Sequence, residues 1–381
     1  MFCVKSRRRS KPTIRLDSLT LSNVRNYAHL ELAPAPGLNV FVGSNAQGKS
    51  NLLEAISLLG TGKSFRTSRE RDLIRDGFEL ATISGTAQVR AGVIRLGCTL
   101  TATERGSRKL YTVNGRNVRY ATFLGSLRVV SFVPADLHLV DGPPSVRRSF
   151  LNGALAQDQK QYYRDLAAYQ KALTNKGSLL RGEAKPDEDL IKIYNEALVT
   201  TGTALMIARN HFIRALGVAA AHVHSQWSQE QERLELSYRP NVPFEAETED
   251  SIAAAFSERL RASAEQERQR GIPLVGPHRD DLGLNLDGRS LAAFGSQGQQ
   301  RTAVLAVKVA EYTVMHERSG EAPLLLLDDV LSELDAQRAR AFLDGVGGFE
   351  QAFITATQLP DALPAGTLYE IEDANVRTRR I

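Results

Sequence analysis

A short glycine-containing segment between an apolar run and a helical pattern constrains this chain more than any other feature. Residues 43–50 read G-S-N-A-Q-G-K-S, directly after the apolar residues 38–42 and directly before a helical pattern over residues 51–59. This is the strand, loop and helix context of a Walker A motif. Gly43 and Gly48 let the backbone wrap tightly, so that successive N–H groups point inward at phosphate oxygens. The alternative interpretation is a glycine turn that caps an ordinary helix.

The same loop predicts which residues bind a nucleotide. The helix that follows adds its positive N-terminal end to the anion site. We expect Lys49 to reach the β- and γ-phosphates, and the Ser50 hydroxyl to occupy a position on Mg²⁺. The predicted nucleotide-binding residues are Gly43, Ser44, Asn45, Ala46, Gln47, Gly48, Lys49, Ser50 and Asn51.

A second acidic motif lies far downstream. Residues 324–327 are four leucines, followed directly by Asp328 and Asp329. Pro323 before the run and polar residues after it limit its length, which favours a buried parallel strand. We expect Asp328 to hold Mg²⁺ and Asp329 to orient or deprotonate an attacking water. The alternative is that the two acids form a solvated turn.

A third motif narrows the class of nucleotide-binding protein. Ser296, Gln297, Gly298 and Gln299 precede a helical run over residues 302–317, so they form a second polar loop at a helix N-terminus. The loop resembles the S-G-G-Q-like signature of ABC-type ATPases, which closes over the γ-phosphate held by another subunit. That resemblance implies that these four residues act in trans, and that residues 332–335 form a D-loop with Asp335 as a further trans contact. Taken alone, the four residues would favour a plain helix cap.

Seven segments in order then carry a resemblance to the RecF family, bacterial recombination mediators of the SMC/Rad50-like branch of the ABC ATPases. Three are the motifs above, of which the acidic one extends through the D-loop. The other four are L-S-N-V-R-N-Y at 21–27, T-G-K-S-F-R-T at 61–67, the segment 134–148 and G-P-H-R-D-D-L at 276–282. The resemblance implies an ATP-dependent homodimer that binds double-stranded DNA near double-strand to single-strand junctions. It also implies a weak, DNA-stimulated ATPase, with ATP and Mg²⁺ as cofactors and mediator proteins of the RecO/RecR type as partners.

Composition agrees with such a protein. The chain has 381 residues, is 42% hydrophobic and 24% charged, and carries a net charge of +5, which favours a polyanionic partner. No stretch approaches eighteen apolar residues, so neither a membrane-spanning helix nor a membrane partner is expected. Two isolated cysteines, Cys3 and Cys98, favour a reducing cytosol.

The pattern along the chain predicts a discontinuous ATPase. We expect a basic arm at 1–13, an N-terminal head segment at 14–133, a helical arm domain at 134–275 and a C-terminal head segment at 276–381. Asn114-Gly115 predicts a tight hairpin in the first head segment, and Tyr163, Leu166, Gln170 and Leu173 predict one buried helix face in the arm. The predicted fold is an α/β ABC-type P-loop head with an antiparallel β subdomain and an inserted, mostly helical arm.

Departures from the wider ABC pattern suggest slow hydrolysis. No glutamine follows the strand at 127–133, Asp329 replaces a glutamate, and Thr355 and Thr357 lie where a switch histidine is expected. A shorter base and a missing histidine should place water poorly, which suits a switch better than a motor. The roles of the two threonines and of residues 278–281 stay open. Two alternatives also remain: a structural SMC-like head that tethers DNA, and a soluble ABC subunit that serves a membrane transporter.

Overall fold

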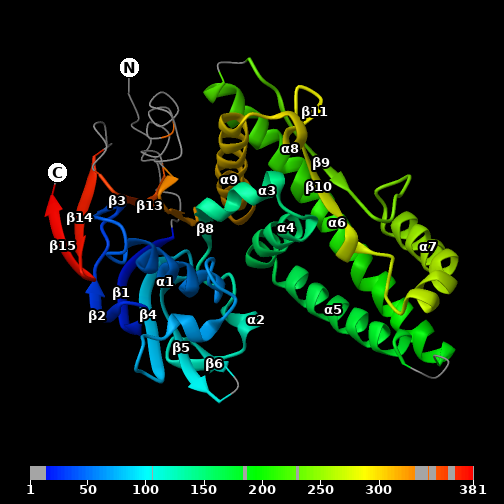
Figure 1. Ribbon diagram of the computed structural model, residues 1–381, viewed down its shortest axis with the longest axis horizontal. Coiled ribbons are helices and arrows are strands. Elements are labelled where there is room, and N and C mark those ends of the chain that lie inside the picture. The colour runs from blue at the N-terminus through cyan, green and yellow to red at the C-terminus, as the bar shows by residue number, and fades with distance from the viewer. Residues whose placement is uncertain are drawn as a thin grey trace, which may run out of the picture. The chain divides into compact units, whose positions relative to one another are not determined.

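The computed structural model describes residues 14–104, 106–182, 187–228, 231–330, 342, 349–358 and 365–380. The predicted basic arm at 1–13 and the predicted D-loop, with Asp335, lie outside these residues. The chain divides into two compact units, Met1–Val133 with Tyr312–Ile381 and Pro134–Glu311. We describe each unit by itself (Figure 1).

The second unit differs in extent from the predicted arm, because it continues past residue 275 to Glu311. The reason is strand pairing: β10 (Asp281–Leu286) pairs antiparallel with β9 (Leu234–Arg239). The sequence of β9, L-E-L-S-Y-R, alternates apolar and polar residues as a half-buried strand does. The predicted mostly helical arm therefore also contains a strand, β9, that the sequence analysis did not identify.

One layer of the first unit is an antiparallel sheet with strand order β2-β1-β4-β5-β6-β7. Its strands are β1 (Arg15–Val24), β2 (Tyr27–Leu32), β4 (Leu80–Val89), β5 (Gly92–Thr103), β6 (Gly106–Val113) and β7 (Arg116–Val118). Asn114 and Gly115 connect the last two with φ angles of 51° and 77°, the backbone that a type I′ turn requires. The predicted hairpin is confirmed.

The other layer is a sheet with order β15-β14-β3-β13-β12-β8, parallel except for its β14–β15 hairpin. Its strands are β3 (Gly37–Val42), β8 (Val129–Phe132), β12 (Leu324–Leu327), β13 (Gln351–Ala356), β14 (Gly366–Glu372) and β15 (Asn375–Arg380). In Figure 1 the blue strand β3 therefore lies among orange and red strands from the other end of the chain.

Helix α1 (Lys49–Thr61) joins the two layers. It contacts β1, β4 and β5 of the antiparallel sheet and β8, β12 and β13 of the parallel one. Its apolar side chains, including Leu52, Leu53 and Leu59, are fully buried in the core that the two sheets share. Burying a helix on two sides explains why its sequence is apolar almost all round. Two short helices, η1 (Glu70–Leu73) and α2 (Tyr120–Phe123), complete this part of the unit.

The second unit is mostly helical, with a small sheet of order β11-β10-β9. Besides β9 and β10, the elements of this unit are η2 (Pro134–Leu137), α3 (His138–Asp141), α4 (Pro144–Asp158), α5 (Lys160–Leu180), α6 (Glu188–Trp227), α7 (Glu249–Arg270), η3 (Pro277–Arg279), β11 (Arg289–Ser290), α8 (Leu291–Phe294) and the larger part of α9 (Gln297–Ser319). The long helix α6 packs against α5, α7 and β9.

The buried face of α5 is rotated by one residue from the predicted face. Gln170 is exposed, and the buried side chains are Tyr162, Tyr169, Ala172, Lys176 and Leu180. The tyrosines can be buried because their hydroxyl groups have partners: Tyr162 donates to Asn152 and Tyr169 contacts His278 Nδ1. Periodicity placed the apolar residues of α5 but gave no sign of these polar partners.

Among the described residues, no helix has the length and apolar character needed to cross a membrane.

Candidate nucleotide-binding site

The loop between β3 and α1 has the backbone of a tight anion-binding turn. Gly48 occupies the N-cap of α1 with φ of 113°, a conformation that favours glycine, and Ala46 has φ of 67°. A Cβ atom at Gly48 would lie 2.7 Å from Asn26 Nδ2. The conformation therefore favours glycine at this position, and any larger residue would also have to displace the Asn26 side chain.

Gly43 is required for a different reason from the one predicted. Its φ angle is not among the positive ones, so it does not supply an unusual turn. A Cβ atom there would lie 2.3 Å from the carbonyl oxygen of Ile371 in β14. Glycine at the start of the loop thus allows the neighbouring strand to approach closely.

Lys49 is folded over the loop and nearly buried. Its Nζ donates to the carbonyl oxygens of Gly43, at 2.5 Å, and Ser44, at 2.8 Å. Burial lowers the pKa of Lys49, and the nearby carboxylates of Asp329 and Asp328 partly oppose that shift. Lys49 also lines the pocket beside the loop.

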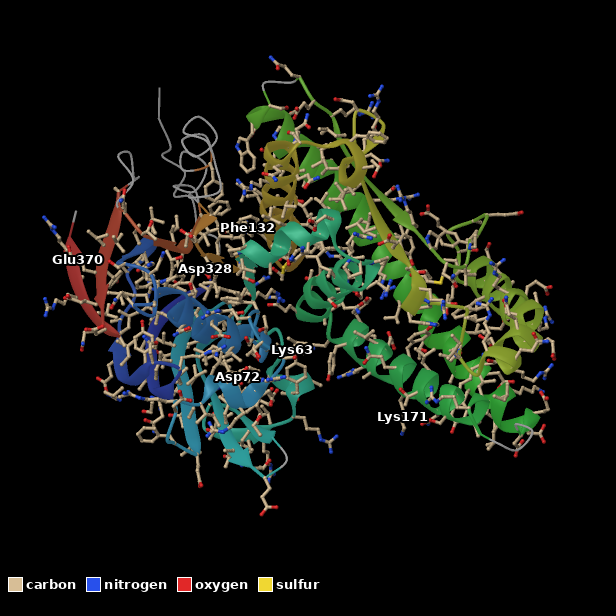
Figure 2. All side chains as sticks on the ribbon, viewed as in Figure 1. Lys63, Asp72, Phe132, Lys171, Asp328 and Glu370 are labelled. Atoms are coloured by element: carbon tan, nitrogen blue, oxygen red, sulfur yellow. The ribbon has the colours of Figure 1, made fainter. Side chains whose placement is uncertain are left out.

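The two predicted halves of the site meet at one carboxylate. Ser50 Oγ donates to Asp328 Oδ1 at 2.8 Å, although 278 residues separate them in the chain. Thr355, which is 1% exposed, donates to the same oxygen at 2.8 Å and accepts the Asp329 N–H at 2.8 Å. Figure 2 labels Asp328 at this position. Thr355 therefore bridges both acids, a role that the sequence could not assign.

A pocket of about 300 Å³ opens beside these groups. It is lined by Asn45, Ala46, Gly48, Lys49, Ser50, Asn51, Arg66, Asp329, Thr355 and Thr357. Arg66 was missed by sequence reasoning, although it belongs to the quoted segment 61–67. Its guanidinium donates to Asn51 Oδ1 at 2.5 Å, which adds a second cation opposite Lys49.

A second depression adjoins the first through shared lining residues. Asn51 and Arg66 line both, and the second also contains Arg25, Asn26 and Asp72. Arg25 is held by a bidentate ion pair to the buried carboxylate of Glu54, at 2.9 Å for each bond. With volumes of about 300 and 750 Å³, the two depressions offer more space than a phosphate group occupies.

The side chain of Gln47 does not line the pocket. Its Oε1 accepts the N–H of Asp373 at 2.5 Å, and its carbonyl oxygen accepts the N–H of Ala374 at 3.1 Å. The prediction that Gln47 contacts nucleotide stays a prediction for its backbone N–H, because only its side chain and carbonyl oxygen are bonded to the turn between β14 and β15.

The predicted signature residues form a helix cap in the second unit. The Ser296 N–H donates to Gln299 Oε1 at 2.8 Å, and Gln299 N–H donates to Ser296 Oγ at 3.3 Å, which is a reciprocal capping box. The Gln299 amide also donates to Glu232 at 2.8 Å. Ser296 and Gln297 remain exposed, whereas Gln299 is occupied within its own unit.

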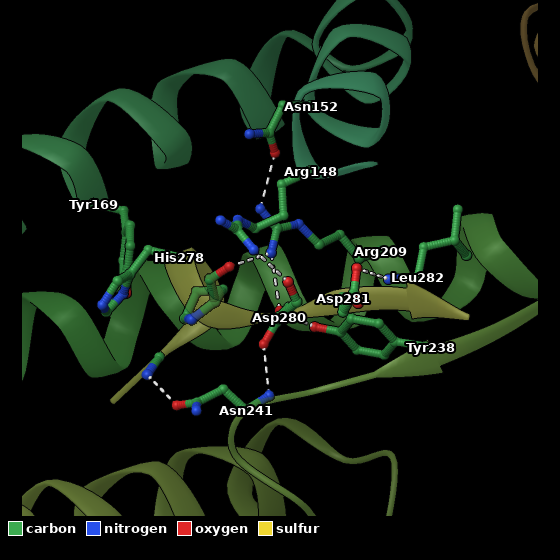
Figure 3. A network of polar contacts seen from close by, with 12 residues as sticks. Arg148, Asn152, Tyr169, Arg209, Tyr238, Asn241, His278, Asp280, Asp281 and Leu282 are labelled. Atoms are coloured by element: carbon green, nitrogen blue, oxygen red, sulfur yellow. Dashed lines mark hydrogen bonds and ion pairs between the residues drawn. The ribbon is translucent and has the colours of Figure 1, made fainter. Parts of the chain in front are cut away.

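The segment 276–282 is the centre of a saturated polar network (Figure 3). Asp280 is 1% exposed and bonds to the buried Arg209, the Tyr238 hydroxyl and the Asn241 N–H. Asp281 forms a bidentate ion pair with Arg147, at 2.6 and 3.0 Å. These contacts favour the structural interpretation of Asp280 and Asp281 over a site.

Comparisons with known proteins agree with this geometry. The RecF/RecN/SMC N terminal domain family matches residues 15–376. The DNA replication and repair protein RecF of Geobacillus thermodenitrificans is 38% identical over 369 residues, covering 95% of this chain and 98% of the relative. The chain belongs to the RecF family.

Solved structures extend the comparison. A structure described as the recombination mediator protein RecF-ATP in the RecFOR pathway is 33% identical, covers 98% of this chain and 99% of that chain, and has a TM-score of 0.89. The Pyrococcus furiosus Smc head domain, solved with the C-terminal domain of ScpA, is 15% identical with a TM-score of 0.56, which shows the fold alone. The predicted class, an ABC-type head with an inserted helical arm, is confirmed.

Proposed function

We propose that this RecF family member is an ATP-dependent DNA-binding protein of recombinational repair, which hydrolyses ATP slowly and uses it as a switch. The observation that carries the proposal is the 2.8 Å hydrogen bond from Ser50 to Asp328 beside the pocket that Lys49 lines. Two motifs far apart in sequence thereby form one phosphate-binding centre. The repair role rests on relatives that are named DNA replication and repair proteins.

The donors at this centre suit a magnesium ion. Mg²⁺ prefers oxygen ligands and is usually held by one or two protein groups together with substrate phosphates. The Ser50 hydroxyl and the Asp328 carboxylate supply such oxygens and already lie within hydrogen-bond distance of each other. We assign these two residues to hold the ion, which when bound would offset negative charge on the phosphates.

The protein's own residues then have distinct roles. Loop N–H groups and the N-terminus of α1 bind the phosphates, and Lys49 moves from the loop carbonyls to the β- and γ-phosphates. Arg66 supplies a second cation, and the depression beside it receives the nucleoside. Asp329, fixed by Thr355 through its backbone, orients the attacking water with a carboxylate one methylene shorter than glutamate. That difference is the reason to expect slow turnover.

The test of the phosphate site is a pair of substitutions at Lys49. Lys49→Arg should keep ATP binding, because a positive charge remains near the phosphates, but should abolish hydrolysis, since the planar guanidinium cannot occupy the lysine position. Lys49→Met should lose both. Nucleotide binding and phosphate release are the measurements. Hydrolysis by Lys49→Arg at the wild-type rate would contradict the assignment.

The signature loop is proposed to act in trans, within an ATP-bound homodimer. Its support is the exposure of Ser296 and Gln297 at the N-terminus of α9. Ser296→Arg should leave ATP binding to the monomer nearly intact while a bulky cation prevents the dimer from closing. Sedimentation with and without ATP measures this. An equal loss of ATP affinity in the monomer would remove the trans assignment.

Double-stranded DNA, near double-strand to single-strand junctions, is the proposed partner, together with mediator proteins of the RecO/RecR type. The net charge of +5 supports a polyanion, and Lys63, Arg66, Arg69 and Arg71 are exposed. Of these, Arg66 lines the nucleotide pocket, and Lys63 lines a neighbouring pocket together with Arg66. An ATP-bound dimer doubles the phosphate contacts. Duplex binding should therefore require ATP and weaken steeply with salt. If the affinity for duplex DNA and its dependence on salt were the same with and without ATP, ATP would not act as a switch for DNA binding.

A further inference from the structure

The apex of the P-loop is held by the turn of a hairpin near the end of the chain. Two hydrogen bonds join them: Asp373 N–H to Gln47 Oε1 at 2.5 Å, and Ala374 N–H to the Gln47 carbonyl at 3.1 Å. From the other sheet, Asn26 Nδ2 also donates to that carbonyl at 3.2 Å. One peptide group of the loop is thus bonded by both layers of the first unit.

The orientation of this peptide group decides whether the loop can bind phosphate. In a planar trans peptide the C=O and the following N–H point in opposite directions. When the Gln47 carbonyl points to the hairpin turn, the Gly48 N–H points the other way. Gly48 lines the candidate nucleotide pocket. The contacts to Gln47 therefore aim a phosphate-binding N–H without touching the nucleotide.

The turn itself has a backbone that its sequence does not favour. Asp373 and Ala374 have φ angles of 47° and 61°. Two other turns with paired positive φ angles have glycine second, Asn114–Gly115 and Asp287–Gly288. An alanine in the left-handed region is disfavoured, and such strain persists only where surrounding structure fixes it. Here the two bonds to Gln47 and the packing of Ala374 on the core fix it.

We infer that the Asp373–Ala374 turn and the Gln47 side chain are positioning residues for the P-loop, which set its nucleotide affinity by orienting the peptide between Gln47 and Gly48. The inference rests on the proposed nucleotide site. Strand β14 also approaches the other end of the loop closely, since a Cβ atom at Gly43 would lie 2.3 Å from the Ile371 carbonyl oxygen. The β14–β15 hairpin therefore helps to shape the nucleotide site, although no side chain of its turn lines the nucleotide pocket.

The first experiment replaces Gln47 with a residue of similar length that cannot accept a hydrogen bond. Gln47→Met should weaken ATP binding by about three- to tenfold, the range for one lost hydrogen bond. The denaturation midpoint should change little, because the loop is partly exposed. A purely structural role would give the opposite pattern, a lower midpoint with unchanged ATP affinity, and would overturn the inference.

The second experiment places the same β-branched residue at positive φ in two hairpins. Ala374→Val forces a β-branched residue to positive φ beside the P-loop, whereas Gly115→Val does so in the β6–β7 turn, where a Cβ meets open space. Only Ala374→Val should weaken ATP binding, by about tenfold or more for two lost bonds. Equal weakening by both variants would reduce the effect to general destabilisation and overturn the inference.

A third measurement needs no nucleotide, so it separates this inference from the proposed function. Hydrogen exchange over residues 44–48 should be faster in Gln47→Met and Ala374→Val than in the wild-type protein and in Gly115→Val. If the wild type binds no ATP, the proposed function is wrong, yet exchange still tests the positioning. Unchanged exchange in both variants would show that the turn does not position the loop.

Discussion

The nucleotide pocket and the Arg209–Asp280 network are built from the same kinds of residue. They differ in what the polar groups face: those of the pocket line an open space, and those of the network are bonded to one another. In the pocket Lys49, Arg66 and Asp329 line a space of about 300 Å³. In the network Arg209 is 2% exposed and donates to Asp280, Pro277, Tyr162 and Asn152. Groups that are fully bonded to one another serve the fold, whereas groups that converge on a space can serve a ligand.

The largest expected effect concerns the network. Arg209→Met should destabilise the protein by about 3–5 kcal/mol, because it leaves the buried Asp280 carboxylate without its charged partner. Chemical denaturation measures this loss. The matched control on the same helix is Arg214→Met, whose ion pair to Glu247 is exposed and should contribute less than about 1 kcal/mol. If Arg209→Met instead spared stability and removed ATP hydrolysis, the distinction between the two regions would fail.

A smaller effect should appear as pH dependence in the same network. Burial, helped by nearby cations and opposed by the Pro273 carbonyl, lowers the pKa of His278 to about 4. The unfolded chain therefore binds a proton below about pH 6.5 that the folded protein does not take up until about pH 4. Stability should fall as pH falls through that window, by up to about 2 kcal/mol between pH 7 and pH 5.

The check on His278 is a pair of denaturation curves. His278→Gln removes the titrating group, so the difference in unfolding free energy between pH 7 and pH 5 should shrink by about the same 2 kcal/mol. ATP binding at pH 7 should respond little. An unchanged pH dependence would mean that other groups control acid stability.

The smallest expected effect tests the pocket side of the comparison. Thr355→Val removes the hydroxyl that bonds Asp328 and Asp329, so hydrolysis should slow by about tenfold, roughly 1.4 kcal/mol. ATP affinity should change by no more than about twofold, because Ser50 and Lys49 remain. Thr355→Ser keeps the hydroxyl and serves as the control. Equal loss of rate in both variants would assign Thr355 to packing.

Much of the site was predictable because it depends on local sequence. The Walker A loop needs a strand, a glycine turn and a helix, and β3, Gly48 and α1 supply them in order. Asp328 was predictable because it follows a strand of four leucines. The fold class followed from the order of such motifs.

What could not be predicted depends on contacts between distant parts of the chain. Thr355, Arg66 and the turn that holds Gln47 reach the loop only through tertiary structure. The sequence drew attention to Thr355 and to the segment that contains Arg66, but it could not assign either residue its contacts. Strand β9 lies among helices, and the face of α5 was set by tyrosine hydroxyl partners. The predicted trans residues Ser296 to Gln299 lie in the second unit, and their action on a second copy stays a prediction.

The order of the parallel sheet has a consequence for synthesis on the ribosome. Strand β3, which leads into the P-loop, pairs with β13 and β14, and the Leu16 N–H bonds to Gln351 across 335 residues of sequence. Strand β3 must therefore wait for almost the whole chain to be made, whereas the strands of the antiparallel sheet all lie within residues 15–118 and the second unit is continuous and ends at Glu311. Because long-range pairing is slow, the edges of β3 stay unpaired for longest during synthesis. We therefore expect chaperones to bind nascent chains of the first unit.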